Sequence, residues 1–131
     1  MHQAAWSKVS IDIIEFLVSM GADVNAKNNE DITPLHITAF DNPDVNIVKY
    51  LVSQGANVNA TQKVDRNDDY GDTPLHDAAK NNTNPEVVRY LVSVRGVNVN
   101  LKNRASQTPF DKANSEEKKA ILRAAGGKSG R

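Results

Sequence analysis

The stretch Thr73-Pro74-Leu75-His76 decides the fold, because the same tetrapeptide occurs 40 residues earlier as Thr33-Pro34-Leu35-His36. Thr108-Pro109-Phe110 is a degraded copy 35 residues later. His2-Gln3-Ala4-Ala5 matches the end of a further copy, since His36 and His76 are also followed by Ala three residues on. A motif that recurs at this period indicates a protein built from stacked repeats.

Each copy of this motif predicts the start of a short helix. Thr is a favourable N-cap, because its hydroxyl accepts a hydrogen bond from an early backbone N–H. Pro at the first helical position loses no hydrogen bond and has its φ angle preset. We expect Leu75 to face the interior, and the Ala pair that follows, Ala78-Ala79, to keep the helix thin enough for close packing.

A second motif has the same period. Gly21-Ala22-Asp23-Val24-Asn25 recurs as Gly55-Ala56-Asn57-Val58-Asn59 and as Gly96-Val97-Asn98-Val99-Asn100. The apolar segments before the three copies, 13–18, 47–52 and 87–92, have helical spacing and predict a second helix in each unit. The Gly after each suits the end of a helix. We interpret the Asn25, Asn59 and Asn100 side chains as bonding to the local backbone.

Together the two motifs resemble the ankyrin repeat, which runs Asp-x-x-Gly-x-Thr-Pro-Leu-His-x-Ala-Ala and ends in Gly-Ala-Asp-Val-Asn-Ala. Residues 68–79 match the first part position by position. The second repeat departs with Asn28 and Asp31, and the last with Asn103, Ser106 and Phe110. The resemblance covers residues 2 to 125. It implies an all-α ankyrin-repeat solenoid of helix-turn-helix units with protruding hairpin loops, three repeats plus a C-terminal cap.

The spacing of the motifs predicts the boundaries of the units. Residues 1–26 are a first repeat that lacks its turn, 27–60 the second, 61–101 the third, 102–125 a capping repeat and 126–131 a flexible tail. The distance from Asn25 to Thr33, and from Asn100 to Thr108, is 8 residues, but from Asn59 to Thr73 it is 14. Six extra residues therefore lie within 61–67, in a loop that tolerates added length.

Composition excludes several classes of function. Sixteen basic residues balance sixteen acidic ones, which argues against a general nucleic-acid or anionic-membrane binder. The absence of cysteine excludes a disulfide framework and a thiolate metal site. No apolar run approaches the roughly 18–20 residues of a membrane span. We expect an intracellular, cytoplasmic monomer with no membrane or nucleic-acid partner.

Conspicuous polar residues do not form a catalytic pattern. We expect His36 and His76 to bond the Thr three residues back and the backbone of the neighbouring repeat, because no carboxylate at fixed spacing orients either imidazole. We therefore predict no enzyme, no cofactor and no metal. Gly126-Gly127-Lys128-Ser129 is not a phosphate loop, since Leu122 stands where its first Gly would be.

One acidic segment leaves an alternative open. Residues 65–72 carry acidic side chains at nearly alternate positions, as in a calcium loop. An EF-hand wants Gly at its sixth position and Glu at its twelfth, where this chain has Tyr70 and His76. A weak cation-binding loop at 65–72 remains an alternative to the architectural interpretation.

The resemblance implies that a partner contacts the finger loops and the exposed parts of the first helices. Trp6 and Phe40 are equivalent positions 34 residues apart, where a polar residue would suit solvent, and aromatic residues are typical interface anchors. For Trp6, core packing of the first repeat is the alternative. The candidate partner-binding residues are Trp6, Glu30, Ile32, Phe40, Asp41, Asp69, Tyr70, Asp72, Lys80 and Arg104.

The sequence thus predicts a non-enzymatic protein–protein interaction module or scaffold that binds a partner protein through the concave face and finger loops. An alternative is a fragment of a larger multidomain protein in which the repeats position another domain, since the turn and Thr-Pro-Leu before His2 are missing. The resemblance also admits hydroxylation of Asn25, Asn59 or Asn100 by an asparaginyl hydroxylase.

Overall fold

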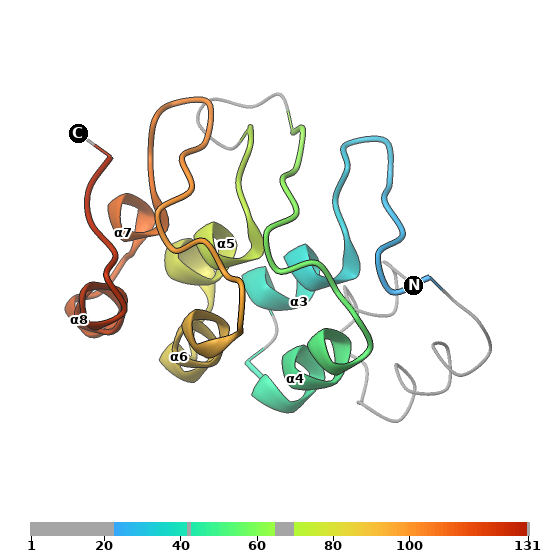
Figure 1. The fold of residues 1–131 in the computed structure, drawn as a ribbon, viewed down its shortest axis with the longest axis horizontal. Coiled ribbons are helices and arrows are strands. Elements are labelled where there is room, and N and C mark those ends of the chain that lie inside the picture. Colours follow the sequence, from blue (N-terminus) through green and yellow to red (C-terminus); the bar gives the residue numbers. More distant parts are fainter. Residues whose placement is uncertain (1–22, 42, 65–69, 131) are drawn as a thin grey trace.

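The computed structural model describes residues 23–41, 43–64 and 70–130, and within these ranges it is made of helices joined by extended loops (Figure 1). The described part of the chain contains helices and no strands, which confirms the all-α prediction. The helices are α3 (Pro34–Asp41), α4 (Val45–Ser53), α5 (Pro74–Asn81), α6 (Pro85–Ser93), α7 (Pro109–Lys112) and α8 (Glu116–Ala124).

The helices form two layers below a row of finger loops. In Figure 1 the fingers stand at the top, the first helices α3, α5 and α7 lie beneath them, and the second helices α4, α6 and α8 lie at the bottom. Within each layer a helix packs on the next along the chain, α3 on α5 and α5 on α7, α4 on α6 and α6 on α8. Each unit therefore contacts its neighbours in the sequence, as in a solenoid.

The first helices begin where the repeated motif predicts. The Thr73 hydroxyl accepts from the backbone N–H of His76 at 3.3 Å, and Pro74 occupies the first turn of α5. The reciprocal bond, from the Thr73 N–H to His76 Nδ1 at 3.0 Å, completes a capping box. Thr108 and Asp111 form the equivalent box at the start of α7. Two orphan donors at each helix start are satisfied in this way.

Aliphatic side chains from both helix layers form the core. Leu35 and Leu75 of the first helices and Leu51, Leu91 and Leu122 of the second helices are at most 1% exposed. Burial of each such side chain stabilises the fold by roughly 1.5–3 kcal/mol. The fully buried alanines of α3 and α5 (Ala39, Ala78 and Ala79) allow the two helices to approach closely.

The turn of each finger needs a positive φ angle. Gly71 supplies it in the third repeat, with φ of 91°. Asp31 and Ser106 stand at the equivalent positions and adopt φ angles of 56° and 63°. Side chains other than Gly are disfavoured there, although Asp adopts this conformation more readily than most residues. The geometry of the turn is thus kept where the sequence departs from glycine.

Three asparagines connect successive units, and we call Asn25, Asn59 and Asn100 the asparagine ladder. The Asn59 side chain donates to the Gly96 carbonyl at 2.9 Å and accepts from the Asn98 N–H at 2.8 Å. Asn25 makes the same pair of bonds with Gly55 and Asn57. Asn100 makes them with Gly126 and Lys128. Our interpretation of these side chains as bonding the local backbone was wrong, because their partners lie in the next unit.

The C-terminal segment differs from the flexible tail expected at 126–131. The Gly127 N–H donates to the Leu122 carbonyl at 2.7 Å, the Thr108 hydroxyl donates to the Lys128 carbonyl at 2.7 Å, and the Gly130 N–H donates to Asp111 Oδ2 at 2.8 Å. Residues 126–130 are therefore held against the last unit, and Gly126 and Lys128 meet Asn100 as Gly96 and Asn98 meet Asn59, in the loop that follows a second helix.

Two further predictions can be placed against the structure. Most of the first repeat (1–26) and part of the insertion lie outside the described residues, so the repeat boundaries stay predictions. Among the helices that the structure describes, none is long and apolar enough to cross a membrane.

The asparagine ladder predicts a specific loss of stability. We expect Asn59→Ala to lower the free energy of unfolding by about 1–3 kcal/mol, because two hydrogen bonds between units are removed. Urea unfolding of the variant measures this. Asn46→Ala, an exposed position on α4, is the matched control and should change stability by less than about 0.5 kcal/mol. Equal effects of the two substitutions would contradict a role for the ladder.

Candidate partner-binding face

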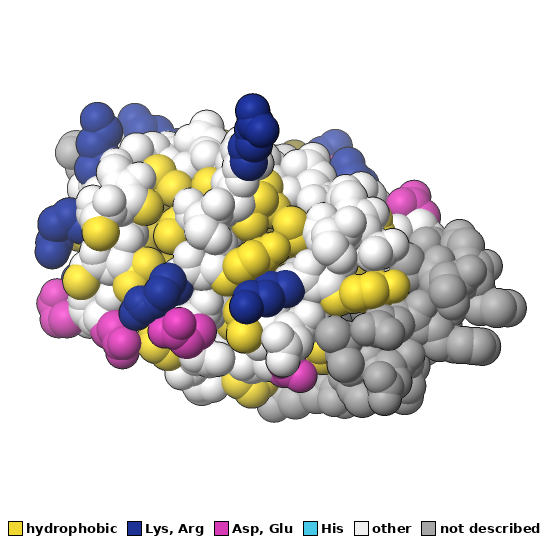
Figure 2. Space-filling model, turned by 60° about the horizontal axis from the view of Figure 1, so that its bottom comes forward, with side chains coloured by type: hydrophobic (Ala, Val, Ile, Leu, Met, Phe, Trp, Pro, Cys, Tyr) yellow, Lys and Arg dark blue, Asp and Glu magenta, His cyan; other side chains and the backbone are white. Residues whose placement is uncertain are grey.

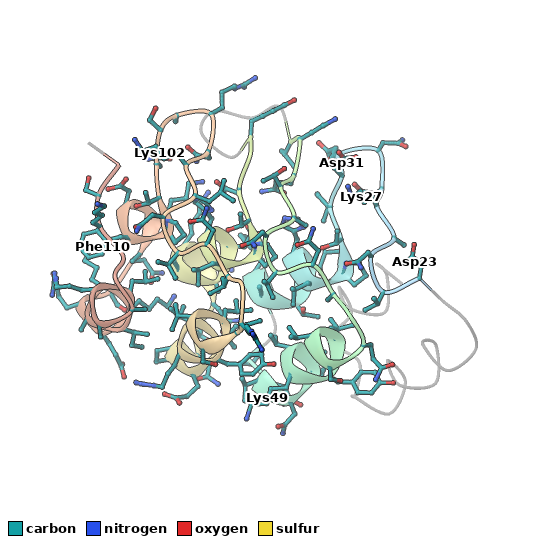
Figure 3. All side chains as sticks on the ribbon, viewed as in Figure 1. Asp23, Lys27, Asp31, Lys49, Lys102 and Phe110 are labelled. Carbon is teal, nitrogen blue, oxygen red and sulfur yellow. The ribbon has the colours of Figure 1, made fainter. Side chains whose placement is uncertain are left out.

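The described candidate residues lie on the finger loops or near the ends of the first helices α3 and α5, and we call this set the finger face: Glu30, Ile32, Phe40, Tyr70, Lys80 and Arg104. Figure 3 shows Lys27, Asp31 and Lys102 on the finger loops above the helices, whereas Lys49 lies on the opposite side, on α4. The finger face therefore combines loop residues with the exposed ends of α3 and α5.

Phe40 is the most conspicuous residue of this face. It lies near the end of α3 and is 40% exposed, the highest exposure of any large hydrophobic side chain in the described part of the chain. The Asn81 side chain donates to the Phe40 carbonyl at 2.9 Å, which ties the end of α3 to the end of α5. Lys80 is also exposed at that end of α5. An aromatic side chain is thus presented to solvent from a fixed backbone.

Tyr70 and Arg104 connect neighbouring fingers. The Arg104 guanidinium lies 4.5 Å from the centroid of the Tyr70 ring, and the Arg104 backbone N–H donates to the Tyr70 carbonyl at 2.8 Å. Such a cation–π contact contributes roughly 0.5–1 kcal/mol at an exposed site. Both residues were predicted as partner contacts, and the structure shows that they also contact each other.

The finger that contains Glu30 and Ile32 is braced in a similar way. The Asn28 side chain accepts from the N–H groups of Glu30 at 2.8 Å and of Ile32 at 3.0 Å. The Lys63 N–H donates to the Glu30 carbonyl at 2.7 Å, and Lys63 forms an ion pair with Asp31 at 3.4 Å. Glu30 is exposed and Ile32 half-buried. These contacts connect the described part of this finger to the described part of the next one.

Asp72 is not part of the accessible surface, and its prediction as an exposed contact residue is corrected. It is 1% exposed, and its Oδ2 atom lies 2.6 Å from the Lys112 ammonium. The Asn103 side chain donates to Asp72 Oδ1 at 2.9 Å. Burial raises the pKa of Asp72, and the bonds from Lys112 and Asn103 oppose that rise. The side chain turns inward because its charge is paired there.

The remaining candidates fall outside what the structure describes. Trp6 and Asp69 lie outside the described residues, and Asp41 ends α3 but its side chain is not among those described. The Asp72–Lys112 pair was missed because the two residues are 40 positions apart. A signal was present in the sequence, since Lys112 stands in its helix where the buried Ile37 stands in α3.

One of the carboxylates of the alternative cation-binding loop at 65–72 is not available to bind a cation. Asp72 is engaged by Lys112, and residues 65–69 lie outside the described part of the chain. Within the described residues, no three or more His, Asp or Glu side chains gather in a way that could hold a metal ion.

The histidines are architectural, as the sequence predicts. His36 Nδ1 accepts from the Thr33 N–H at 3.1 Å, and its Nε2–H donates to the Asp72 carbonyl of the next unit at 3.1 Å. His76 makes the same bonds with Thr73 and with the Gln107 carbonyl. Burial lowers the pKa of His36 to about 4 and also lowers the pKa of His76. Both rings are therefore neutral at pH 7.

Comparison with known proteins agrees with this architecture. A family model described as ankyrin repeats in three copies matches residues 1–103. No curated protein matches the chain.

The buried histidines predict a loss of stability in acid. The unfolded chain binds a proton at the ordinary His pKa of 6.5, whereas folded His36 does so only near pH 4. The stability is therefore complete above pH 6.5 and falls by about 1.4 kcal/mol per pH unit for this group as pH drops toward 4. Urea unfolding at several pH values measures the slope. His36→Asn should flatten it, and an unchanged slope in that variant would contradict the assignment.

The buried ion pair predicts a second effect on stability. We expect Lys112→Met to cost about 3–5 kcal/mol at pH 7, because it leaves the Asp72 charge buried without its cation. The double change of Asp72→Asn with Lys112→Met should recover most of this loss, since the Asn103 bond can be kept. Lys102→Met, on an exposed finger, is the control for the same chemical change. A single-variant cost no larger than that of the control would contradict the prediction.

Proposed function

Since this chain belongs to the ankyrin-repeat family, whose repeats are typically protein–protein interaction modules, we propose that it binds a partner protein through its finger face. The family is generally non-catalytic, in agreement with the lack of any catalytic pattern in the sequence. We propose that the molecule acts as a recognition module or scaffold.

The exposure of Phe40 is the observation on which this proposal rests. Phe40 is 40% exposed, and contact of its apolar ring with water is unfavourable. Burial of the ring by a partner would therefore contribute to the free energy of binding. Its backbone is tied to α5 through Asn81, so the ring is presented without loop movement. Exposed aromatics on rigid elements are typical centres of protein interfaces.

The braced fingers favour binding for a second reason. The Tyr70–Arg104 contact and the Lys63–Asp31 ion pair hold adjacent fingers together. A partner therefore does not have to order the described parts of these loops when it binds, which removes part of the entropic cost of association.

Mixed charges surround the proposed anchors. Glu30 on one finger, Arg104 on another and Lys80 at the end of α5 are all exposed. Exposed charges of both signs beside aromatic side chains fit a protein interface, in which a polar rim surrounds apolar anchors. It does not fit a nucleic-acid surface, which would need a strongly basic stripe.

We predict that Phe40→Ala and Tyr70→Ala together weaken capture of the partner from a lysate of the source organism by about tenfold or more, because two aromatic anchors are lost. Quantitative affinity capture with wild-type and variant protein measures this. Gln54→Ala, at the exposed C-cap of the second helix α4 and outside the finger face, is the control and should bind as wild type.

Helicity should be nearly unchanged in the double variant and the melting temperature should fall by only a few degrees, since neither side chain belongs to the buried core and the Tyr70–Arg104 contact contributes roughly 0.5–1 kcal/mol. Normal capture by the double variant would overturn the proposal, as would melting well below that of the parent.

A further inference from the structure

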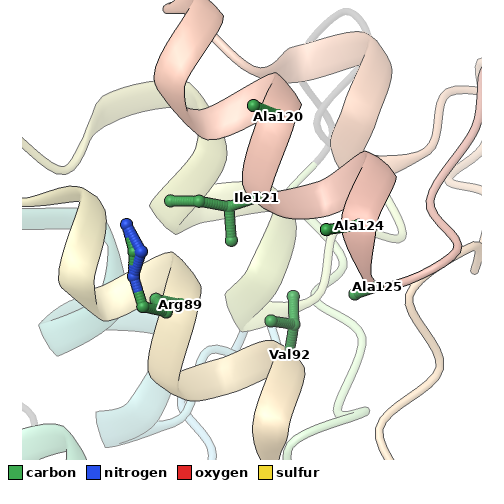
Figure 4. Close-up of a pocket in the computed structure, with 6 residues that line it drawn as sticks. All are labelled: Arg89, Val92, Ala120, Ile121, Ala124 and Ala125. Carbon is green, nitrogen blue, oxygen red and sulfur yellow. The ribbon is translucent and has the colours of Figure 1, made fainter.

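A groove opens between the second helices α6 and α8, on the side of the molecule away from the finger face. We call it the α6–α8 groove. Figure 4 shows its lining, in which Arg89 and Val92 of α6 face residues of α8 and its C-terminal end, namely Ala120, Ile121, Ala124 and Ala125. Figure 2 shows apolar side chains gathered near the middle of the face that it presents.

Repeat equivalence explains why this groove is open. The buried Leu91 of α6 and Leu122 of α8 are equivalent, so Ala120 stands where α6 has Arg89, Ile121 where it has Tyr90, and Ala124 where it has Ser93. Each residue on α8 is smaller than its counterpart. At the α4–α6 interface, large side chains of α6 fill the space between the helices. At the α6–α8 interface, the smaller side chains of α8 leave the equivalent space open.

The preceding interface shows what fills the equivalent space. Between α4 and α6 it is the half-buried Tyr90 ring, with the Lys49 ammonium 5.7 Å from the ring centroid. Burial raises the pKa of the Tyr90 hydroxyl, in agreement with a ring that is partly removed from water. The equivalent of Lys49 in the α6–α8 groove is Arg89, and the equivalent of the ring is only Ile121. The cation is present and the aromatic ring is absent.

Arg89 is positioned to lie over such a ring. Its Nε atom is 3.2 Å from a carboxylate oxygen of Glu86 on the same helix, and its Nη2 atom is 4.0 Å from one of Glu117 on α8. The glutamates contact the edge of the planar guanidinium. An aromatic ring would stack on the face of the guanidinium, so the ion pairs do not compete with stacking.

The rim of the groove carries excess negative charge. Glu86 and Glu117, both exposed, lie within 4.0 Å of the single Arg89 at one end of the groove, so two negative charges face one positive charge there. In Figure 2 the acidic side chains gather at the lower left, beside the apolar area. Basic residues in a partner would therefore be attracted to this end of the groove.

We propose that the α6–α8 groove binds an aromatic side chain of a partner protein that is flanked by lysine or arginine. The ring lies between Val92 and Ile121 beneath the Arg89 guanidinium, in the position that Tyr90 holds beneath Lys49 one unit earlier. The flanking basic residues face the glutamates of the rim. This site is separate from the finger face and binds independently of it.

The test uses the whole chain, labelled with ¹⁵N, and the peptide acetyl-Lys-Tyr-Lys-amide as the probe. We expect shift changes at Val92, Ile121 and Ala124 with a dissociation constant on the order of millimolar, and none at Phe40 or Lys80. Acetyl-Lys-Leu-Lys-amide lacks the ring and acetyl-Glu-Tyr-Glu-amide reverses the charge, and each should bind at least about fivefold more weakly.

Two variants test the site from the protein side. Ala124→Leu fills the groove from an exposed helix position and should weaken the probe about tenfold, whereas Ser93→Leu, the same kind of change at the equivalent position of α6, should not. Arg89→Gln keeps the groove open and should weaken the probe several-fold through loss of the cation.

Absence of shift changes, equal binding of the leucine peptide, or normal binding to Ala124→Leu would each overturn the proposal. So would shift changes confined to the finger face. Capture of a partner at the finger face is measured separately, so failure of either proposal leaves the other standing.

Discussion

The structure depends on hydrogen bonds that each unit makes with the backbone of the next. A pair of helices with one extended loop is too small to bury a core alone, so its polar loop groups must be satisfied by a neighbour. Two sets of side chains do this at different heights. The ladder of Asn25, Asn59 and Asn100 holds the loops that follow the second helices, and His36 and His76 hold the fingers. Apolar packing adds stability, and these bonds fix the register between units.

The last unit shows the same constraint where no further unit follows in the described chain. Asn100 accepts from the Lys128 N–H in the loop that follows α8, as in the earlier units, and Asp111 accepts from the Gly130 N–H at the position where His36 and His76 donate to the next finger. Lys118 is buried at a position where earlier units have aliphatic residues, and its ammonium donates to the Ala79 carbonyl at 3.3 Å and to the Asn114 side chain at 3.0 Å. Burial lowers the pKa of Lys118, which is the expected response of a charge removed from water.

Recognition is expected where the units depart from one another, because the positions they share are occupied by architecture. Phe40 is such a departure on the finger face, since Lys80 stands at the equivalent place in the next unit. The small residues of α8 are another, because they leave the α6–α8 groove unfilled. The family relationship accounts for the arrangement of the helices and loops. The side chains that differ between units determine the surface that a partner would contact.

The sequence by itself determined the family, the paired helices, the capping of Thr73 and the structural role of His76, because these depend on local spacing and on residues whose conformational preferences are strong. Only the tertiary structure decided which exposed-looking residues are accessible. Asp72 turned inward because Lys112, 40 residues away, neutralises it, and the asparagines reached across to the next unit. The end of the chain was held by Asp111 and Asn100. These pairings depend on distances between folded elements, which the spacing of the motifs along the chain did not indicate for Asp72 and the asparagines.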